Sequence, residues 1–128
     1  MKIITAAKAP AAIGPYSHAI VHNGTIFCSG QIPLDPATMK IVGDTIETQT
    51  QQVMKNVKLV LEAAGTSLDK IIKATIFLSS MADFAGMNQV YEVALKGHKP
   101  ARSAFEVARL PKDALVEIEC IAALDQGE

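Results

Sequence analysis

One long segment with helical spacing constrains the fold of this chain more than any other feature. From Ile46 to Ala64, apolar and small residues recur at the three- and four-residue intervals of a single buried helix face. Asp44, with Glu47 three residues later, is a plausible N-terminal cap, and Gly65 suits the left-handed position after the last turn. We therefore expect a helix here, with one face packed against the rest of the molecule.

Segments typical of strands lie on both sides of this helix. Asn23-Gly24 is the strongest two-residue signal for a hairpin turn, and it joins two apolar runs within residues 18–29. A second helix is expected to begin after Asp83 and to end near Lys96, where Gly97 would close it. The remaining strand-like runs are residues 71–78, 103–108 and 115–123.

The order of these elements indicates an α+β fold. A strand-helix-strand passage favours a right-handed parallel crossover, which together with the hairpin gives a mixed sheet. Two helices can cover only one face of that sheet, yet the other face also carries many apolar positions. We therefore expect a single domain over residues 1–128 whose second sheet face is buried by another copy of the chain.

Charge and hydropathy exclude several classes of protein. The chain has 12 basic and 13 acidic residues, a formal net charge of -1, and no run of like charges. Bulk electrostatics therefore draw it neither to nucleic acid nor to an anionic membrane. No apolar stretch approaches the ~20 residues that span a bilayer, and the first residues lack the apolar middle of a secretory signal. The expected location is the cytosol.

Residues that commonly hold metals or cofactors are sparse. Three histidines stand at no ligand spacing with cysteine or carboxylate, and the sequence has no glycine-rich phosphate loop, HExxH, CxxC or GxSxG motif. We expect neither a metal nor an organic cofactor. Cys28 and Cys120 both fall in strand-like segments, so we interpret them as buried, reduced thiols.

Two charged residues stand out as candidates for chemistry. Arg102, one of only two arginines, lies at the start of an apolar strand, where its guanidinium needs an anionic partner. That partner is either the carboxylate of a ligand or one of the protein's own acids. Glu117 lies on the opposite side of its strand from Val116 and Ile118, on a face that is either solvated or buried between subunits. If that face is buried, Glu117 becomes a partly desolvated carboxylate able to orient a water molecule.

Three further positions have both a structural and a functional interpretation. Tyr16 follows a Gly-Pro turn, and packing alone would explain it. Asn88 falls inside the second helix, where it either faces water or makes a specific hydrogen bond. Ser29-Gly30 is expected at the end of a strand, as a plain turn or as a place where backbone approaches a ligand.

Several separated motifs make the sequence resemble the reactive intermediate deaminase (Rid) family, also described as the liver perchloric-acid-soluble protein family. The resemblance covers residues 9 to about 123. The motifs are APAAIGPYSHA at 9–19, FCSGQIP at 27–33, NQVY at 88–91, KPARS at 99–103, VARLPK at 107–112 and VEIE at 116–119.

The resemblance implies a fold, an assembly and an activity. The expected fold is a chorismate-mutase-like α+β domain, with two helices on one face of a mixed sheet, and three copies close a barrel with clefts at the subunit interfaces. The expected reaction is hydrolysis of 2-aminoacrylate and related 2-imino acids to 2-keto acids and ammonia. The resemblance implies that Arg102 binds the substrate carboxylate and that Glu117 helps to position the attacking water. The other positions that match the cleft are Tyr16, Ser29, Gly30, Asn88 and Ala104.

Two departures and two rival functions accompany this expectation. Ala104 stands where relatives often have cysteine, so only its backbone is expected to contact a ligand, and Leu95 replaces a usual aromatic residue. One rival is a holdase-like or carboxylate-binding module without turnover. The other is a ribonuclease, which the 5% aromatic content and the net charge of -1 disfavour.

Overall fold

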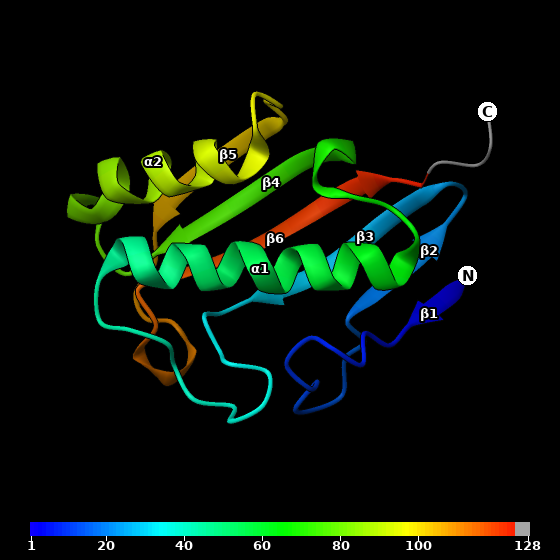
Figure 1. The fold of residues 1–128 in the computed structure, drawn as a ribbon, viewed down its shortest axis with the longest axis horizontal. Coiled ribbons are helices and arrows are strands. Elements are labelled where there is room, and N and C mark those ends of the chain that lie inside the picture. Colours follow the sequence, from blue (N-terminus) through cyan, green and yellow to red (C-terminus); the bar gives the residue numbers. More distant parts are fainter. Residues whose placement is uncertain (125–128) are drawn as a thin grey trace.

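The long helical segment forms α1 (Ile46–Ala64), which lies across one face of a β-sheet (Figure 1). The computed structural model describes residues 1–124 of the chain. Its second helix, α2 (Phe84–Leu95), lies on the same face as α1 and beside it. The strands are β1 (Lys2–Ile4), β2 (Ala19–His22), β3 (Thr25–Gln31), β4 (Ile71–Leu78), β5 (Ala101–Glu106) and β6 (Val116–Ala123).

These strands form one mixed sheet in the order β1-β2-β3-β6-β4-β5. Among residues 1–124, β4 and β5 are the one parallel pair, and α2 is the crossover between them. The other neighbours are antiparallel. Strand β6 lies between β3 and β4, so the C-terminal strand joins the hairpin to the parallel pair. The predicted α+β class, mixed sheet and two helices are confirmed.

The predicted bounds of α1 are correct, but its predicted cap is not. Thr45, not Asp44, is the N-cap, because its extended backbone places the side-chain oxygen to accept a hydrogen bond from the Thr48 N–H at 3.2 Å. Gly65 ends the helix with φ of 90°, as predicted. At the end of α2 the C-cap is Lys96, with φ of 51°, and Gly97 is the residue after it.

The hairpin turn agrees with the sequence pattern, whereas some strand bounds differ from it. Asn23 and Gly24 both have positive φ, 50° and 73°, as the predicted hairpin turn requires. Strand β5 begins at Ala101 and ends at Glu106, so both of its ends lie two residues before the predicted ones. Strand β1 was not predicted, since three residues are too few to show a period.

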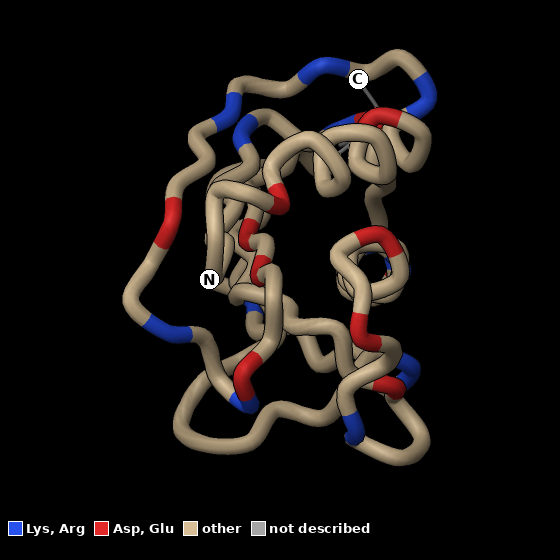
Figure 2. Tube along the Cα trace, turned by 90° about the vertical axis from the view of Figure 1, so that its left-hand side faces the viewer, with Lys and Arg blue, Asp and Glu red and all other residues tan. Residues whose placement is uncertain are grey.

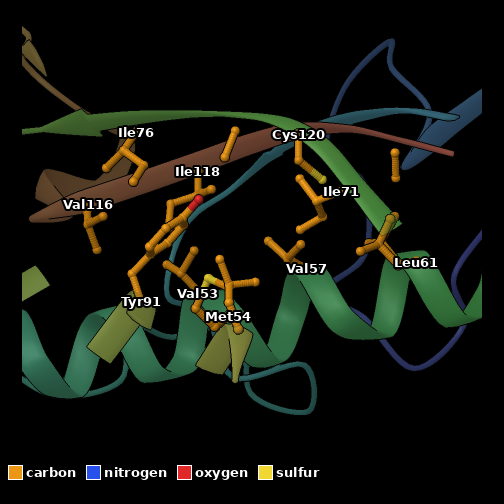
Figure 3. Packing of buried hydrophobic residues seen from close by; sticks show 14 of the residues in the cluster. Val53, Met54, Val57, Leu61, Ile71, Ile76, Tyr91, Val116, Ile118 and Cys120 are labelled. Atoms are coloured by element: carbon orange, nitrogen blue, oxygen red, sulfur yellow. The ribbon is translucent and has the colours of Figure 1, made fainter. Parts of the chain in front are cut away.

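The core lies between the helices and the sheet (Figure 3). Alternate residues of β4 and β6 point toward α1 and are fully or almost fully buried. The helices contribute the i, i+3, i+4 faces that their sequences predict. The largest fully buried side chains of this core include Ile26, Val53, Val60, Leu61, Ile76, Leu78, Met87, Val116 and Ile118.

The opposite sheet face is also apolar, although both helices lie on the other side. Phe27 is paired in register with Ile121, and Phe77 with Phe105. The rings of Phe77 and Phe105 meet edge to face, with centroids 5.3 Å apart. Phe27 and Phe105 remain 47% and 45% exposed in the single chain. Such a face is typical of an interaction surface.

A buried amide ties α1 to the loop that follows β3. Asn56 is fully buried, and its side-chain nitrogen donates to the carbonyls of Ile32 at 3.2 Å and Leu34 at 2.9 Å. Its side-chain oxygen accepts a hydrogen bond from Gln52 at 3.0 Å. The Ile32 carbonyl also accepts a hydrogen bond from the Leu34 N–H at 2.7 Å, so the amide matters most for the buried Leu34 carbonyl.

Replacing Asn56 with alanine should lower the free energy of unfolding by about 3 kcal/mol, because the buried Leu34 carbonyl and the Gln52 amide lose their partner. Urea unfolding followed by circular dichroism measures this effect. Lys55→Ala, an exposed change on the same helix, is the matched control and should stay within about 0.5 kcal/mol of the parent. An equal effect of the two substitutions would contradict the role assigned to the amide.

Basic and acidic residues follow one another along the chain without a run of like charges, in keeping with the formal net charge of -1. Figure 2 shows both kinds of position on the backbone trace seen from this side. Neither helix in residues 1–124 combines the length and the apolar character that crossing a membrane demands.

Candidate functional site

Arg102 lies on the helix-facing side of β5, above two aromatic rings. Its register partner on β4 is Ala74, a buried core residue, so its side chain extends toward α2. The guanidinium carbon is 5.6 Å from the ring centroid of Phe84 and 5.2 Å from that of Tyr91. These distances are typical of cation–π contacts, which fix the plane of the guanidinium.

Asn88 completes the support of this arginine. Its side-chain oxygen accepts a hydrogen bond of 2.6 Å from Arg102 Nη1. Phe84, Asn88 and Tyr91 are four and three residues apart, so one face of α2 presents all three to β5. Of the two alternatives for Asn88, exposure to water or a specific hydrogen bond, the structure shows the hydrogen bond. The sequence did not predict that the rings of Phe84 and Tyr91 contact Arg102, although their spacing around Asn88 on the second helix can be read from it.

Arg102 has no carboxylate partner within the described residues. The one ion pair found in residues 1–124 joins Arg109 to Asp113 at 3.0 Å, on the surface. The predicted alternative, a structural pair between Arg102 and an acid of its own chain, is therefore absent from this part of the structure. Arg102 is more exposed than its apolar sequence context indicated, because β5 is an edge strand.

A hollow of about 450 Å³ opens beside this guanidinium. Its walls come from the second half of α2 and from the start of β5, and they include Asn88, Tyr91, Leu95, Lys99, Pro100 and Arg102. Leu95 thus lines the same hollow as Arg102. In residues 1–124 no group of three or more His, Cys, Asp or Glu side chains is placed to hold a metal ion.

A second group of predicted residues gathers around a bulge in β3. Cys28 pairs with Cys120 and Gln31 with Ile118, so Ser29 and Gly30 together face the single residue Glu119. The expected strand end is therefore wrong. Strand β3 continues to Gln31, and the glycine marks an irregularity inside the strand.

The bulge brings Gly30 against the carboxylate of Glu117. A Cβ atom at position 30 would overlap Glu117 Oε2, so only glycine leaves room for this side chain. Glu117 is half-buried in the single chain. Burial, and then the charge of Glu119, raise the pKa of the Glu117 carboxyl above its ordinary value.

The N-terminal loop adds Tyr16 near this bulge. The Ser29 hydroxyl donates to the Ser17 carbonyl at 2.6 Å, and the Ser29 N–H donates to the His18 carbonyl at 3.0 Å. Tyr16, which directly precedes Ser17, is 49% exposed, and its hydroxyl accepts a hydrogen bond of 3.3 Å from the Ile13 N–H. A hollow of about 320 Å³ is lined by Tyr16, Ser17 and His18, among others.

Replacing Gly30 with alanine should displace the Glu117 carboxylate. Because the resemblance implies that Glu117 places the attacking water, we expect deaminase activity to fall by about 10-fold or more. Stability should change less, since the overlapping atom is the end of a flexible side chain. Steady-state kinetics and thermal unfolding of the same preparation separate the two effects. Parent-like activity would show that the contact between Gly30 and Glu117 is not needed.

The two groups lie on opposite faces of the sheet within one chain. Arg102 faces the helices, as its partner Ala74 does, whereas Glu117 is paired with Phe77 on the open face. Ala104 pairs with Ile76 and is on the same face as Arg102, partly buried against the core. A single chain therefore unites Arg102 with Asn88, and Glu117 with Ser29 and Gly30, but it does not unite the two groups.

A hollow of greater volume lies elsewhere in the described part of the chain. It has a volume of about 750 Å³ and lies between the middle of α1 and the C-terminal half of α2. None of the residues predicted for the site lines it, apart from Leu95 at its edge. The volume of a hollow therefore does not by itself identify the candidate functional site.

Comparison with known proteins gives a consistent result. Residues 6–124 match the family model described as Endoribonuclease L-PSP. A RutC family protein, PH0854 of Pyrococcus horikoshii, is 53% identical over 121 residues, covering 94% of this chain and 96% of the relative. A 2-iminobutanoate/2-iminopropanoate deaminase of Mus musculus is 43% identical over 121 residues, covering 94% and 90%.

The fold comparison points to the same group of proteins. The crystal structure of E. coli TdcF with bound serine superposes with a TM-score of 0.92 at 43% identity. The match covers 98% of this chain and 100% of that one. Since a family model covers nearly all described residues and several relatives align along their full length, sequence and fold agree.

Proposed function

This chain belongs to the endoribonuclease L-PSP family, which contains the reactive intermediate deaminases, and from that premise we propose that it hydrolyses 2-aminoacrylate and related 2-imino acids. The products are the 2-keto acid and ammonia. We further propose that it acts in the cytosol and needs neither a metal nor an organic cofactor.

The contacts of Arg102 with its neighbours are the observation that best supports this proposal. The guanidinium rests on Phe84 and Tyr91, one of its nitrogens is held by Asn88, and no carboxylate of residues 1–124 neutralises it. The remaining donors of its planar fork suit the two oxygens of a small carboxylate. Each charge-assisted hydrogen bond contributes about 1.5 to 3 kcal/mol, which is enough to orient a ligand of a few atoms.

The complete site is proposed to form between copies of the chain. Two observations support this assembly: Arg102 and Glu117 are on opposite faces of one sheet, and the open face carries exposed phenylalanines. In a closed homotrimer with a chorismate-mutase-like arrangement, the edge of one protomer that bears Arg102 meets the face of the next that bears Glu117. Light scattering should then give three times the chain mass of 13.6 kDa.

The proposed mechanism needs few groups because 2-aminoacrylate tautomerises to the 2-imino acid, whose C=N carbon is already electrophilic. Arg102 binds the carboxylate and thereby sets the imine carbon in place. Glu117 holds a water molecule against that carbon and accepts a proton as the C–O bond forms. The nitrogen gains protons and leaves as ammonia when the carbonyl is produced. A carboxyl whose pKa is raised suits this role, since it is a stronger base toward the water proton than an ordinary glutamate.

The other predicted residues are proposed to shape the cleft. Tyr16, Ser29 and Gly30 stand with Glu117, and Asn88 and the backbone of Ala104 stand with Arg102. Leu95 lines the hollow beside the guanidinium. We propose small imino acids as the substrate class, because the carboxylate contact with Arg102 is sufficient to orient a ligand of a few atoms.

The two rival functions receive less support. A ribonuclease is suggested by the name of the family model, but the net charge of -1 and the 5% aromatic content disfavour a basic, stacking surface for RNA. A binding module that holds carboxylates without turnover would use the same Arg102. It has no need of a half-buried carboxylate in a glycine-lined bulge.

A coupled assay tests the proposal. A pyridoxal-phosphate lyase generates 2-aminoacrylate in solution, and the release of keto acid is followed with and without this protein, before and after treatment with a chelator. We expect acceleration that the chelator leaves unchanged. Tight binding of pyruvate without acceleration would favour the binding module, and activity restored by one metal would reject the cofactor-free mechanism.

A further inference from the structure

Cys28 and Cys120 face each other directly across two neighbouring strands. They are register partners in the antiparallel pair of β3 and β6. Opposed residues in such a pair have Cα atoms about 4.5 to 5.5 Å apart, and their side chains point to the same face. Disulfides form when Cα atoms are about 4.4 to 6.8 Å apart. The backbone already holds the two residues within that range.

Both thiols point to the helix-facing side of the sheet. Cys120 is 3% exposed and extends from β6 toward the core (Figure 3). Cys28 packs against the same core but is only partly buried. The neighbouring Cys28 thiol, and then burial, raise the pKa of Cys120. Cys28 is therefore the thiol that a small oxidant reaches first, and Cys120 lies beside it.

The chain offers no third thiol to compete with this pair. Cys28 and Cys120 are the only two cysteines of the sequence, and both are free. We propose that they form an oxidative modification site, in which a peroxide converts the two thiols into one disulfide between β3 and β6.

The reaction balances in two steps. The Cys28 sulfur attacks the peroxide, the O–O bond breaks, and a sulfenic acid and one water form. The Cys120 sulfur then attacks the Cys28 sulfur, the S–O bond breaks, and the departing hydroxide takes the thiol proton as a second water. Two thiols and one hydrogen peroxide thus give one disulfide and two waters, and a dithiol reductant reverses the change.

The new bond would join strands that are already paired, next to the bulge at Ser29 and Gly30. It would close a loop of about 90 residues and restrict the unfolded chain, which raises the unfolding temperature. We expect an increase of about 5 °C in the oxidised protein. The oxidised strands should keep their register.

Intact-mass spectrometry after treatment of the folded protein with hydrogen peroxide tests the site. Each chain is expected to lose two hydrogen atoms without gaining oxygen, to lose both titratable thiols, and to recover them with dithiothreitol. Peptide mapping should find Cys28 linked to Cys120 of the same chain. Stable addition of oxygen, chains linked to one another, or two thiols that stay reduced would each overturn the proposal.

Single substitutions make the assignment specific. Cys120→Ala removes the second thiol, so its oxidised form should gain oxygen atoms at Cys28 and show no rise in unfolding temperature. Cys28→Ser changes the less buried member and should leave Cys120 unoxidised at the same peroxide dose. If Cys120→Ala does not fold, Cys28→Ser and the parent protein still decide the result. Oxidation of Cys120 in Cys28→Ser at the parental rate would contradict the proposed order.

Discussion

Arg102→Ala is expected to abolish deaminase turnover and to weaken binding of pyruvate, an inert keto acid, by about 100-fold. The substitution removes a bidentate, charge-assisted contact that contributes about 3 kcal/mol or more. It also leaves the rings of Phe84 and Tyr91 and the amide of Asn88 without the group they hold. Steady-state kinetics and calorimetric titration with pyruvate measure the two effects.

Arg109 provides the matched control for this experiment. It is the other arginine of the chain, exposed at the surface and paired with Asp113. Arg109→Ala removes the same charge and should change turnover and pyruvate binding by less than about twofold. Arg102→Lys keeps a charge but not the planar fork, so it should recover binding only in part. If Arg102→Ala binds and turns over like the parent, the carboxylate-binding role is wrong.

Glu117→Gln is expected to slow turnover by about 100-fold while pyruvate binding stays within a few-fold of the parent. The amide keeps the shape of the carboxylate but cannot accept a proton. The parent should also lose activity as the pH falls through the pKa of Glu117. Because burial and Glu119 raise that pKa, this loss should occur at higher pH than for an ordinary glutamate.

The pH profile separates this role from a structural one. In Glu117→Gln the acidic limb assigned to Glu117 should disappear, since no carboxyl titrates at that position. Glu119→Gln is the matched control, because it removes the exposed acid opposite the bulge and its contribution to the pKa of Glu117. It should shift the limb to lower pH without removing it. An unchanged acidic limb in Glu117→Gln would exclude Glu117 as the titrating base.

The fold was predictable wherever a long periodic pattern existed. The 19 residues of α1 and the eight of β4 have their predicted bounds. When one face of an element is buried, apolar residues recur along its sequence at the spacing of that element, and this spacing shows where it begins and ends. Strand β1 has three residues and shows no such pattern. Asp44 and Thr45 are both residue types that cap helices. Which of them is the cap depends on the extended backbone conformation at Thr45, which the sequence does not show.

The site was only partly predictable for a physical reason. Arg102 and Asn88 were singled out separately, yet their hydrogen bond depends on how α2 packs against β5. The bulge at Ser29 and Gly30 needs the register of β3 on β6, a contact between residues about 90 positions apart. A single sequence does not specify such long-range pairing. It therefore left the choice between a turn and a ligand-facing backbone open.

The most direct test of the central claim mixes the two inactive variants. In a cyclic trimer whose sites take Arg102 from one protomer and Glu117 from the next, a mixed trimer of Arg102→Ala and Glu117→Gln chains contains one intact site. Refolding the variants together in equal amounts should restore about a quarter of the parental keto acid release from 2-aminoacrylate, by random assortment. Each variant alone should stay at about 1% of the parental rate or below. Mixed trimers, verified by native mass spectrometry, that remain inactive would contradict a deaminase site shared between subunits.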